Sequence, residues 1–247
     1  MTAYGPLAAS YDGLTRDIDY AAICDFIETV LHKAGAHPET VLDLACGTGT
    51  MSVLLAKRGY QVLGADISEE MLTVAAQKAA ELTENAPYFI RQPMQRLRLP
   101  QPVDAAVCLL DSLNYVTDPA DCRKTFSRVF ASLRPGSVFV FDINTPNKLR
   151  ALDGQVFLDE NEESYCVWRT EFDGAENCCY YGIDLFQKCG ELWRRSFEQH
   201  CEYAYDPQTL TQWLYKAGFA RVTAFGDCRT APPEADEQRI YFCAEKE

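Results

Sequence analysis

One short segment constrains the fold of this chain more than any other. Positions 41–50 read Val-Leu-Asp-Leu-Ala-Cys-Gly-Thr-Gly-Thr. An apolar run of strand length that meets a glycine-rich turn predicts a buried strand, a tight turn and then a helix. Gly47 and Gly49 carry no Cβ, so the backbone can approach a ligand closely at this turn. The segment therefore predicts a ligand site at the carboxyl end of the first strand of an α/β fold.

The same alternation of strand and helix continues to about residue 150. We expect strands at 41–45, 61–65, 88–91, 103–110 and 137–143, with helices near 50–58, 68–83 and 119–134. Ser68 and Asp118 stand where helix caps are expected. A later helix begins after Asp206 and ends at Gly218, and two more strands, 219–225 and 239–244, follow it. Alternating strands and helices predict a parallel, doubly wound sheet, here of seven strands.

Residues 151–205 interrupt this rhythm. Strand-like runs at 155–158, 164–172, 177–188 and 192–205 follow one another without a helix, and Asp173-Gly174 and Cys189-Gly190 are typical turn pairs. This pattern predicts an antiparallel β insert. The predicted fold class is therefore α/β: a doubly wound, seven-stranded, mostly parallel Rossmann-like sheet with an antiparallel insert.

The first residues predict two helices. Tyr4, Leu7, Ala8 and Tyr11 are spaced as one face of a short helix. Asp19 is placed to cap a second helix that ends at Gly35. We therefore divide the chain into a helical lid (1–35), a Rossmann-like ligand-binding domain (36–150 with 206–247) and an antiparallel insert (151–205), which we expect to cap the cleft and select the substrate.

Charge and composition exclude several partners. The chain has 36 acidic and 23 basic residues, a net charge of −13, which argues against nucleic acid and against an acidic membrane surface. No apolar run approaches the roughly 20 residues of a membrane span, and the first residues lack the pattern of a signal peptide.

The 11 cysteines include no C-x-x-C pair, which predicts free, mostly buried thiols and no metal site. We expect a cytoplasmic protein.

The second strand adds a carboxylate to the site. Asp66 ends that strand, and in doubly wound folds a carboxylate at this place accepts hydrogen bonds from ribose hydroxyls. A dinucleotide site would need a third glycine where this chain has Ser52. Asp43 would also face a pyrophosphate, whereas a carboxylate there suits a cationic ligand. A nucleoside with a positive charge is therefore favoured over NAD, although a dinucleotide oxidoreductase stays as an alternative.

These residues resemble motif I of the class I S-adenosylmethionine-dependent methyltransferases, D-x-[GA]-x-G-x-G, here Asp43-x-Ala45-x-Gly47-x-Gly49. The resemblance implies S-adenosylmethionine as cofactor, with the turn holding the methionine moiety and Asp66 the ribose. The cofactor-binding residues that it implies are Tyr11, Asp43, Ala45, Cys46, Gly47, Gly49, Asp66, Ile67, Met71, Met94, Gln95, Leu110 and Asp111.

The stretch after the third strand, Gln92-Pro93-Met94-Gln95, departs from the family. Pro93 stands where an aspartate is usual in relatives, and it offers neither a side-chain acceptor nor an N–H. Adenine would be held instead by packing on Met94, by the Met94 N–H and by Gln95 or Gln92. This departure keeps open a second interpretation, a non-catalytic S-adenosylmethionine-binding or regulatory module.

The opening Tyr4-x-x-x-Ala8-x-x-Tyr11-Asp12 is similar to the N-terminal lid of bacterial small-molecule methyltransferases. In those enzymes a tyrosine of this segment closes over the sulfonium, which implies Tyr11 first and Tyr4 second. A general base is needed only where the acceptor must lose a proton. His200 is the candidate, on a strand face with Glu198 and Glu202 that meets either solvent or the cleft. Tyr11 and His200 are therefore the predicted catalytic residues.

The sequence thus predicts a metal-independent methyltransferase that uses in-line transfer to a small-molecule acceptor. Residues 109–115 do not match the N/D-P-P-Y motif of enzymes that methylate DNA bases and protein glutamine. RNA methylation is a further alternative that the net charge disfavours. The acceptor and the oligomeric state are left open.

Overall fold

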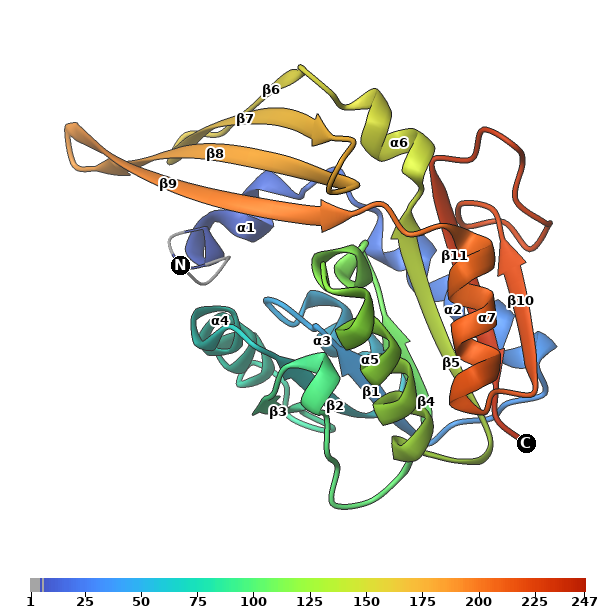
Figure 1. Ribbon diagram of the computed structural model, residues 1–247. Helices are drawn as coiled ribbons and strands as arrows, with labels where there is room; N and C mark the ends of the chain where they lie inside the picture. Colours follow the sequence, from blue (N-terminus) through green and yellow to red (C-terminus); the bar gives the residue numbers. More distant parts are fainter. Residues whose placement is uncertain (1–4, 6) are drawn as a thin grey trace.

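The computed structural model describes residues 5 and 7–247, which form two β-sheets and their covering helices (Figure 1). The elements are α1 (Ala8–Leu14), α2 (Tyr20–Lys33), β1 (Thr40–Leu44), α3 (Thr50–Lys57), β2 (Gln61–Asp66), α4 (Glu69–Ala79), β3 (Tyr88–Arg91), η1 (Met94–Arg96), β4 (Val103–Cys108), η2 (Ser112–Tyr115), α5 (Pro119–Ser132), β5 (Leu133–Asn144), α6 (Pro146–Ala151), β6 (Val156–Glu160), β7 (Ser164–Asp173), β8 (Cys178–Cys189), β9 (Leu192–Tyr203), α7 (Pro207–Ala217), β10 (Arg221–Phe225) and β11 (Arg239–Glu245).

The larger sheet has seven strands in the order β10-β11-β5-β4-β1-β2-β3. β1 pairs in parallel with β2 and β4, as do β2 with β3 and β4 with β5, whereas β11 is antiparallel to both of its neighbours. The predicted α/β class, with seven mostly parallel strands and a separate antiparallel sheet, is confirmed. This order brings the carboxyl ends of β1, β2, β4 and β5 to one edge.

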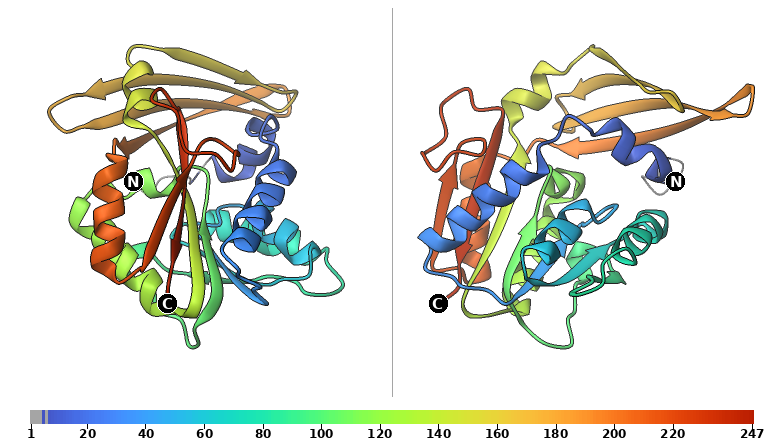
Figure 2. Two further views of the ribbon diagram at one scale, coloured as in Figure 1. Left: turned by 90° about the vertical axis from the view of Figure 1, so that its right-hand side faces the viewer. Right: turned by 180° about the vertical axis from the view of Figure 1, so that it is seen from behind.

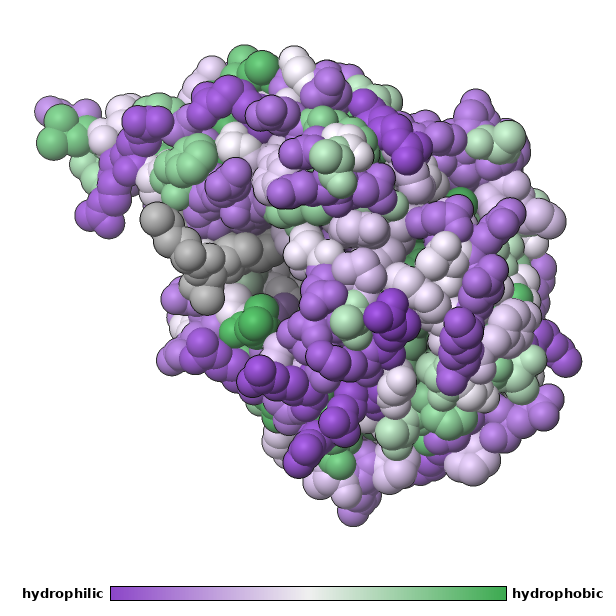
Figure 3. Space-filling view, viewed as in Figure 1, coloured by the Kyte–Doolittle hydropathy of each residue, from purple (hydrophilic) through white to green (hydrophobic). Residues whose placement is uncertain are grey.

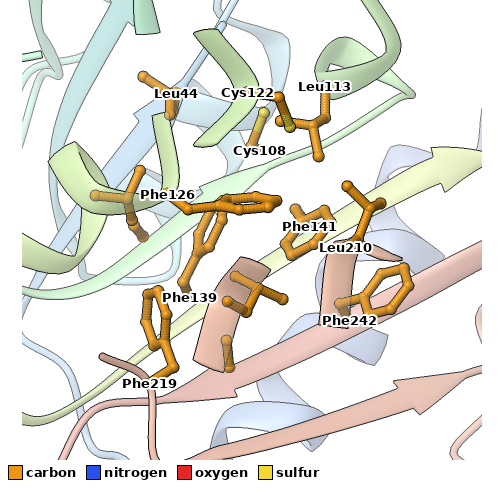
Figure 4. Packing of buried hydrophobic residues seen from close by; sticks show 14 of the residues in the cluster. Leu44, Cys108, Leu113, Cys122, Phe126, Phe139, Phe141, Leu210, Phe219 and Phe242 are labelled. Carbon is orange, nitrogen blue, oxygen red and sulfur yellow. The ribbon is translucent and has the colours of Figure 1, made fainter. Parts of the chain in front are cut away.

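Helices cover both faces of this sheet (Figure 2). Successive side chains of a strand point to opposite faces, and β5 follows this rule. Phe139 and Phe141 pack with α5 and α7, as Figure 4 shows for Phe126 and Leu210 of those helices. Val138 and Val140 belong to the opposite core, with α2 and α3. The near-continuous apolar strands of the sequence are explained by burial on both faces.

The antiparallel sheet has the order β6-β7-β8-β9 and lies beyond the carboxyl ends of the parallel strands, with α1 beneath it (Figure 1). Leu7, next to α1, is buried against Cys166, Ile183 and Leu185 of this sheet. The outer edge and tip of the sheet expose apolar residues, among them Leu158 and Leu192 (Figure 3). This sheet therefore packs on α1 through the middle of its strands and faces solvent at its tip.

Several expectations for the local structure can be compared directly. The two N-terminal helices are confirmed as α1 and α2, and Asp19 caps α2 by accepting from the Ala22 N–H at 2.9 Å. Tyr4 lies outside the described residues. The strand expected over 103–110 ends at Cys108, because Leu110 and Asp111 adopt left-handed backbone conformations (φ 56° and 52°) that turn the chain into η2.

All eleven cysteines are free and eight of them are buried, which confirms the interpretation of the thiols. Within residues 5 and 7–247, no helix has both the length and the apolar character needed to cross a membrane.

Candidate active site

The two glycines of the β1–α3 turn have different roles. Both adopt positive φ, 53° at Gly47 and 75° at Gly49, a conformation that glycine reaches without strain. A Cβ on Gly47 would meet no atom within 4 Å, so this residue opens onto a cleft. A Cβ on Gly49 would lie 2.8 Å from the Ala75 Cβ. Gly49 thus allows α4 to pack closely and, unlike Gly47, does not line the cleft.

Asp66 is held by the backbone at the end of β2. Its carboxylate accepts the Gly47 N–H at 2.9 Å and the Ser68 N–H at 2.8 Å, one on each oxygen. Burial raises the pKa of Asp66 above its ordinary value. Each oxygen keeps one further lone pair, so the side chain is oriented and can still accept two hydroxyl groups. This geometry fits the ribose diol that the sequence assigns to Asp66.

Asp43 is buried at the carboxyl end of β1, and it accepts a hydrogen bond from the hydroxyl of Ser52. Burial raises the pKa of Asp43 to about 6. Ser52 is the residue that replaces the third glycine of a dinucleotide motif, and its hydroxyl is what keeps Asp43 partnered inside the protein. Sequence reasoning noted the missing glycine but missed this function of the serine.

A cleft runs along the carboxyl ends of β1, β2 and β4 in three adjoining compartments. The outer one has a volume of about 260 Å³ and includes Asp66, Pro93 and Met94 in its lining. The middle one, of about 280 Å³, is lined by Tyr11, Gly47 and Tyr115 among others. The inner one, of about 50 Å³, is bounded by Asp43, Tyr11 and Tyr20.

The cleft collects most of the predicted cofactor residues. Those that line at least one compartment are Tyr11, Asp43, Ala45, Cys46, Gly47, Asp66, Ile67, Met71, Met94, Gln95 and Leu110. Gly49 and Asp111 are absent from these linings. The Asp111 carboxylate instead lies 2.6 Å from Arg239, which also pairs with the buried Asp142. Arg239, at the start of β11, was missed because nothing local in the sequence links it to Asp111, 128 positions earlier.

The outer compartment contains carboxylates near Pro93. Asp118 and Asp121, from the start of α5, line it together with Gln95, whose amide donates to Asp121 at 3.3 Å. Asp118 is engaged as the cap of α5 and accepts the Ala120 N–H at 2.7 Å. Sequence reasoning placed Asp118 at a helix start and did not single out Asp121. Acceptor groups near the expected adenine site therefore come from the start of α5 as well as from the segment after β3.

The lid helix α1 is attached at both ends. Asp12 accepts a hydrogen bond from the Thr48 hydroxyl at 2.6 Å and pairs with Lys78 of α4 at 2.5 Å. The Leu7 N–H donates to Glu198 of the insert at 2.8 Å. Between these contacts Tyr11 faces the middle and inner compartments, and burial keeps its pKa well above the ordinary value, so the phenol is neutral. The α1 segment thus connects the glycine turn and α4 with the antiparallel sheet.

His200 faces inward, not solvent. It is 2% exposed, and the neighbouring Phe197, on the other face of β9, is 48% exposed. Its Nε2 lies 3.0 Å from Glu198, and its Nδ1 lies 3.4 Å from the Tyr115 hydroxyl. His200 is not part of the cleft lining and meets the cleft through Tyr115. The sequence identified the histidine, but nothing in it linked His200 to Tyr115, which is 85 positions away.

Comparison with known proteins agrees with this geometry. A family model described as a methyltransferase domain matches residues 41–136. The protein named "Putative methyltransferase YqeM" from Bacillus subtilis is 32% identical over 247 residues, with 98% of this chain and 97% of that protein covered. A crystal structure of an S-adenosylmethionine-dependent methyltransferase from Clostridium acetobutylicum has a TM-score of 0.86 and 29% identity over 99% of both chains.

The chain belongs to the class I S-adenosylmethionine-dependent methyltransferases. The structure of CalS10 from Micromonospora echinaspora, an amino pentose methyltransferase with S-adenosylmethionine bound, shares the fold with a TM-score of 0.77 at 20% identity and covers 100% of this chain and 99% of that one. The cofactor of this methyltransferase is S-adenosylmethionine, and the Gly47 opening and the two remaining acceptor positions of Asp66 fit it.

Proposed function

We propose that this methyltransferase acts on a small-molecule acceptor that binds in the cleft beside S-adenosylmethionine, at the Tyr115 side and beneath the antiparallel sheet. The observation that carries the proposal is the closure of the cleft by α1, which is fastened to the glycine turn through Asp12 and to the insert through Leu7. A cavity of about 280 Å³ under such a cover suits a small molecule better than a polymer. The name of CalS10 and the net charge of −13 both favour this choice.

S-adenosylmethionine, when bound, supplies a methyl group on a sulfonium that a nucleophile can displace. The chain's own part is to bind, orient and exclude water. Asp66 orients the nucleoside through the ribose, and Gly47 lets the backbone approach the methionine moiety. Tyr11 closes the middle compartment from the lid side. Alignment of this kind contributes up to roughly 7–11 kcal/mol in favourable intramolecular reactions.

We further propose that the transfer needs no metal and that residues 151–205 act as the substrate cap. Among residues 5 and 7–247, no three His, Cys, Asp or Glu side chains lie together in a way that could hold a metal ion. The cap would place β8 and β9 over the acceptor, where Tyr181 and His200 form a directly opposed pair across the strands.

The test is a transfer assay that detects S-adenosylhomocysteine formation, run in the presence of a chelator. The acceptor probes are an amino sugar (glucosamine), glycine, a phenol and a short unstructured RNA. We expect turnover with at least one small molecule and none with RNA. Tight binding of S-adenosylhomocysteine together with transfer to RNA alone would refute the small-molecule proposal. Turnover that disappears with chelator and returns with a divalent cation would refute the metal-free mechanism.

A further inference from the structure

Three side chains form a hydrogen-bonded row that leads from the cleft into the protein. Tyr115 of η2 lines the outer and middle compartments. Its hydroxyl lies 3.4 Å from Nδ1 of His200, and Nε2 of the same ring lies 3.0 Å from Glu198. The separation of 3.4 Å is longer than an ordinary hydrogen bond, and such contacts often tighten only when substrate is bound. The row has the base-and-orienter geometry of a proton acceptor.

The surroundings hold this row in place. Asn114, buried beside Tyr115, donates to the backbone carbonyls of Asn144 and Tyr203 at 3.0 Å each and so fixes η2 between β5 and β9. Glu198 is 8% exposed, and its second oxygen accepts the Leu7 N–H of the lid. The carboxylate that faces His200 is therefore oriented by the same lid that closes the cleft.

We propose that Tyr115, His200 and Glu198 form a proton relay that takes one proton from the methyl acceptor, and that this acceptor is a primary or secondary amine. The inference rests on the proposed function, because it assigns a chemistry to the acceptor of that same cleft. Tyr115 is the catalytic residue of the relay, since of the three it is the one that lines the outer and middle compartments as the described residues form them. His200 and Glu198 act through it.

The proton balance of the relay is simple. The acceptor arrives as an ammonium ion and gives one proton to the Tyr115 oxygen while Tyr115 passes its own hydroxyl proton to Nδ1 of His200. His200 becomes an imidazolium that the Glu198 carboxylate stabilises, and the acceptor becomes a neutral amine. The amine lone pair then forms the bond to the methyl carbon, and the electron pair of the broken carbon–sulfur bond stays on sulfur. The imidazolium later releases its proton to solvent.

Charge around the relay favours an amine. Among the described residues, titratable groups that face His200 include Tyr115 on η2, Tyr181 opposite it on β8, and Glu198 and Glu202 on the same face of β9. Lys148 lies beyond Glu202, where it donates to Asn144 at 2.8 Å. Glu198 is the carboxylate in contact with His200, and its negative charge attracts an ammonium ion. Glu202 adds no full charge at neutral pH, because burial raises its pKa to about 8. An ammonium ion, with an ordinary pKa of about 10, can pass its proton to imidazole at a cost of a few pKa units, whereas an aliphatic alcohol holds its proton far more strongly.

The first test needs no acceptor. The chain has three histidines, so ¹⁵N-histidine labelling gives few imidazole signals, and His32→Gln and His200→Gln identify two of them. In the complex with S-adenosylhomocysteine at about pH 7.5, a relay requires the neutral tautomer with its proton on Nε2. Tyr115→Phe should then shift the Nδ1 signal of His200. A proton on Nδ1, or a doubly protonated ring, would overturn the relay because Nδ1 could accept nothing from Tyr115.

The second test is kinetic and uses glucosamine and glycine as amine probes, with a phenol as the alternative. Tyr115→Phe and His200→Gln should lower kcat with the amine by about 10²–10⁴-fold, while the dissociation constant of S-adenosylhomocysteine stays within about threefold. Tyr215→Phe and His32→Gln change exposed residues of α7 and α2 and serve as matched controls.

The pH profile separates a relay from a merely structural role. A proton acceptor gives kcat a limb that rises with pH as the acceptor loses its own proton. Glu198→Gln removes the charge that stabilises the imidazolium, so this rising limb should move to lower pH and its plateau should fall. A Glu198→Gln profile that keeps the wild-type position would overturn the relay. Turnover of the phenol without any amine would overturn the assignment of an amine acceptor. Transfer to RNA alone would instead refute the proposed function, whereas the relay itself is judged by the tautomer of His200 in the S-adenosylhomocysteine complex.

Discussion

Replacement of Asp66 by asparagine should weaken the cofactor far more than it weakens the fold. In the structure each carboxylate oxygen accepts one backbone N–H, from Gly47 or from Ser68, and each has one lone pair left. Asparagine keeps only one oxygen. Its NH₂ group must face one of the two backbone donors, and it offers no acceptor there for a ribose hydroxyl.

The magnitude follows from the bonds that are lost. A hydrogen bond to a charged group contributes about 1.5–3 kcal/mol. Loss of one such bond to the ribose and neutralisation of the other should cost about 2–4 kcal/mol, which is about 30–700-fold in the dissociation constant. Because the pKa of Asp66 is raised, wild-type affinity should also fall toward acid pH as the carboxylate is protonated, and Asp66→Asn should lack this dependence.

Calorimetric titration with S-adenosylhomocysteine measures both effects. Glu84→Gln, an exposed change of the same kind beyond the end of α4, is the matched control and should bind as the wild type does. Binding by Asp66→Asn within about threefold of wild type, with an intact melting transition, would refute the assignment of the ribose to this carboxylate.

Three further predictions concern the lid, the turn and the buried acid. Asp12→Asn removes the ion pair with Lys78 and weakens the contact with the Thr48 hydroxyl, and these two contacts hold α1 in place. Because Asp12 is partly exposed, we expect the closed position of α1 to lose about 1 kcal/mol of stability, which stopped flow should show as about fivefold faster release of S-adenosylhomocysteine. An unchanged release rate would contradict the role of the lid. Gly49→Ala forces a Cβ against α4 in a left-handed conformation and should lower the free energy of unfolding in urea by about 2–4 kcal/mol, whereas Gly174→Ala, where the new Cβ meets nothing, should change it little. Burial raises the pKa of Glu202 from 4.5 to about 8, so the folded state holds a proton that the unfolded chain releases above about pH 4.5. The wild-type Tm should therefore fall as pH rises from about 5 to 8, and Glu202→Gln should flatten this slope; an equal slope in both proteins would contradict it.

The elements of the site that depend on local sequence were predictable. The strand, the turn and the following helix of motif I lie within ten residues, so their geometry is set by apolar pattern and by glycine conformation. Asp66 was predictable for a related reason. Adjacent parallel strands end at the same edge of the sheet, which brings its carboxylate to the Gly47 N–H.

Other groups at the site could not be found in this way. The Asp111 carboxylate looked like a cofactor ligand because it follows β4, yet it pairs with Arg239. That contact exists only because β11 pairs with β5 in the antiparallel direction. This pairing places Arg239, at the start of β11, beside the carboxyl end of β5 at the edge of the cleft. The role of Gly49 in packing likewise needed the position of α4.

The sequence by itself determined the fold class, the succession of strands and helices along the chain, and the cofactor. The first two follow from hydrophobic periodicity and spacing, and the cofactor follows from a motif that lies within one strand and the turn after it. Only the tertiary structure decided that His200 faces inward, that Tyr115 connects it to the cleft and that Glu198 is oriented by the lid. Such contacts join residues far apart in the chain. They depend on how the antiparallel sheet packs over the parallel one. The alternating direction of side chains along a strand determines which residues share a face, but it does not determine which residues of another element that face will contact.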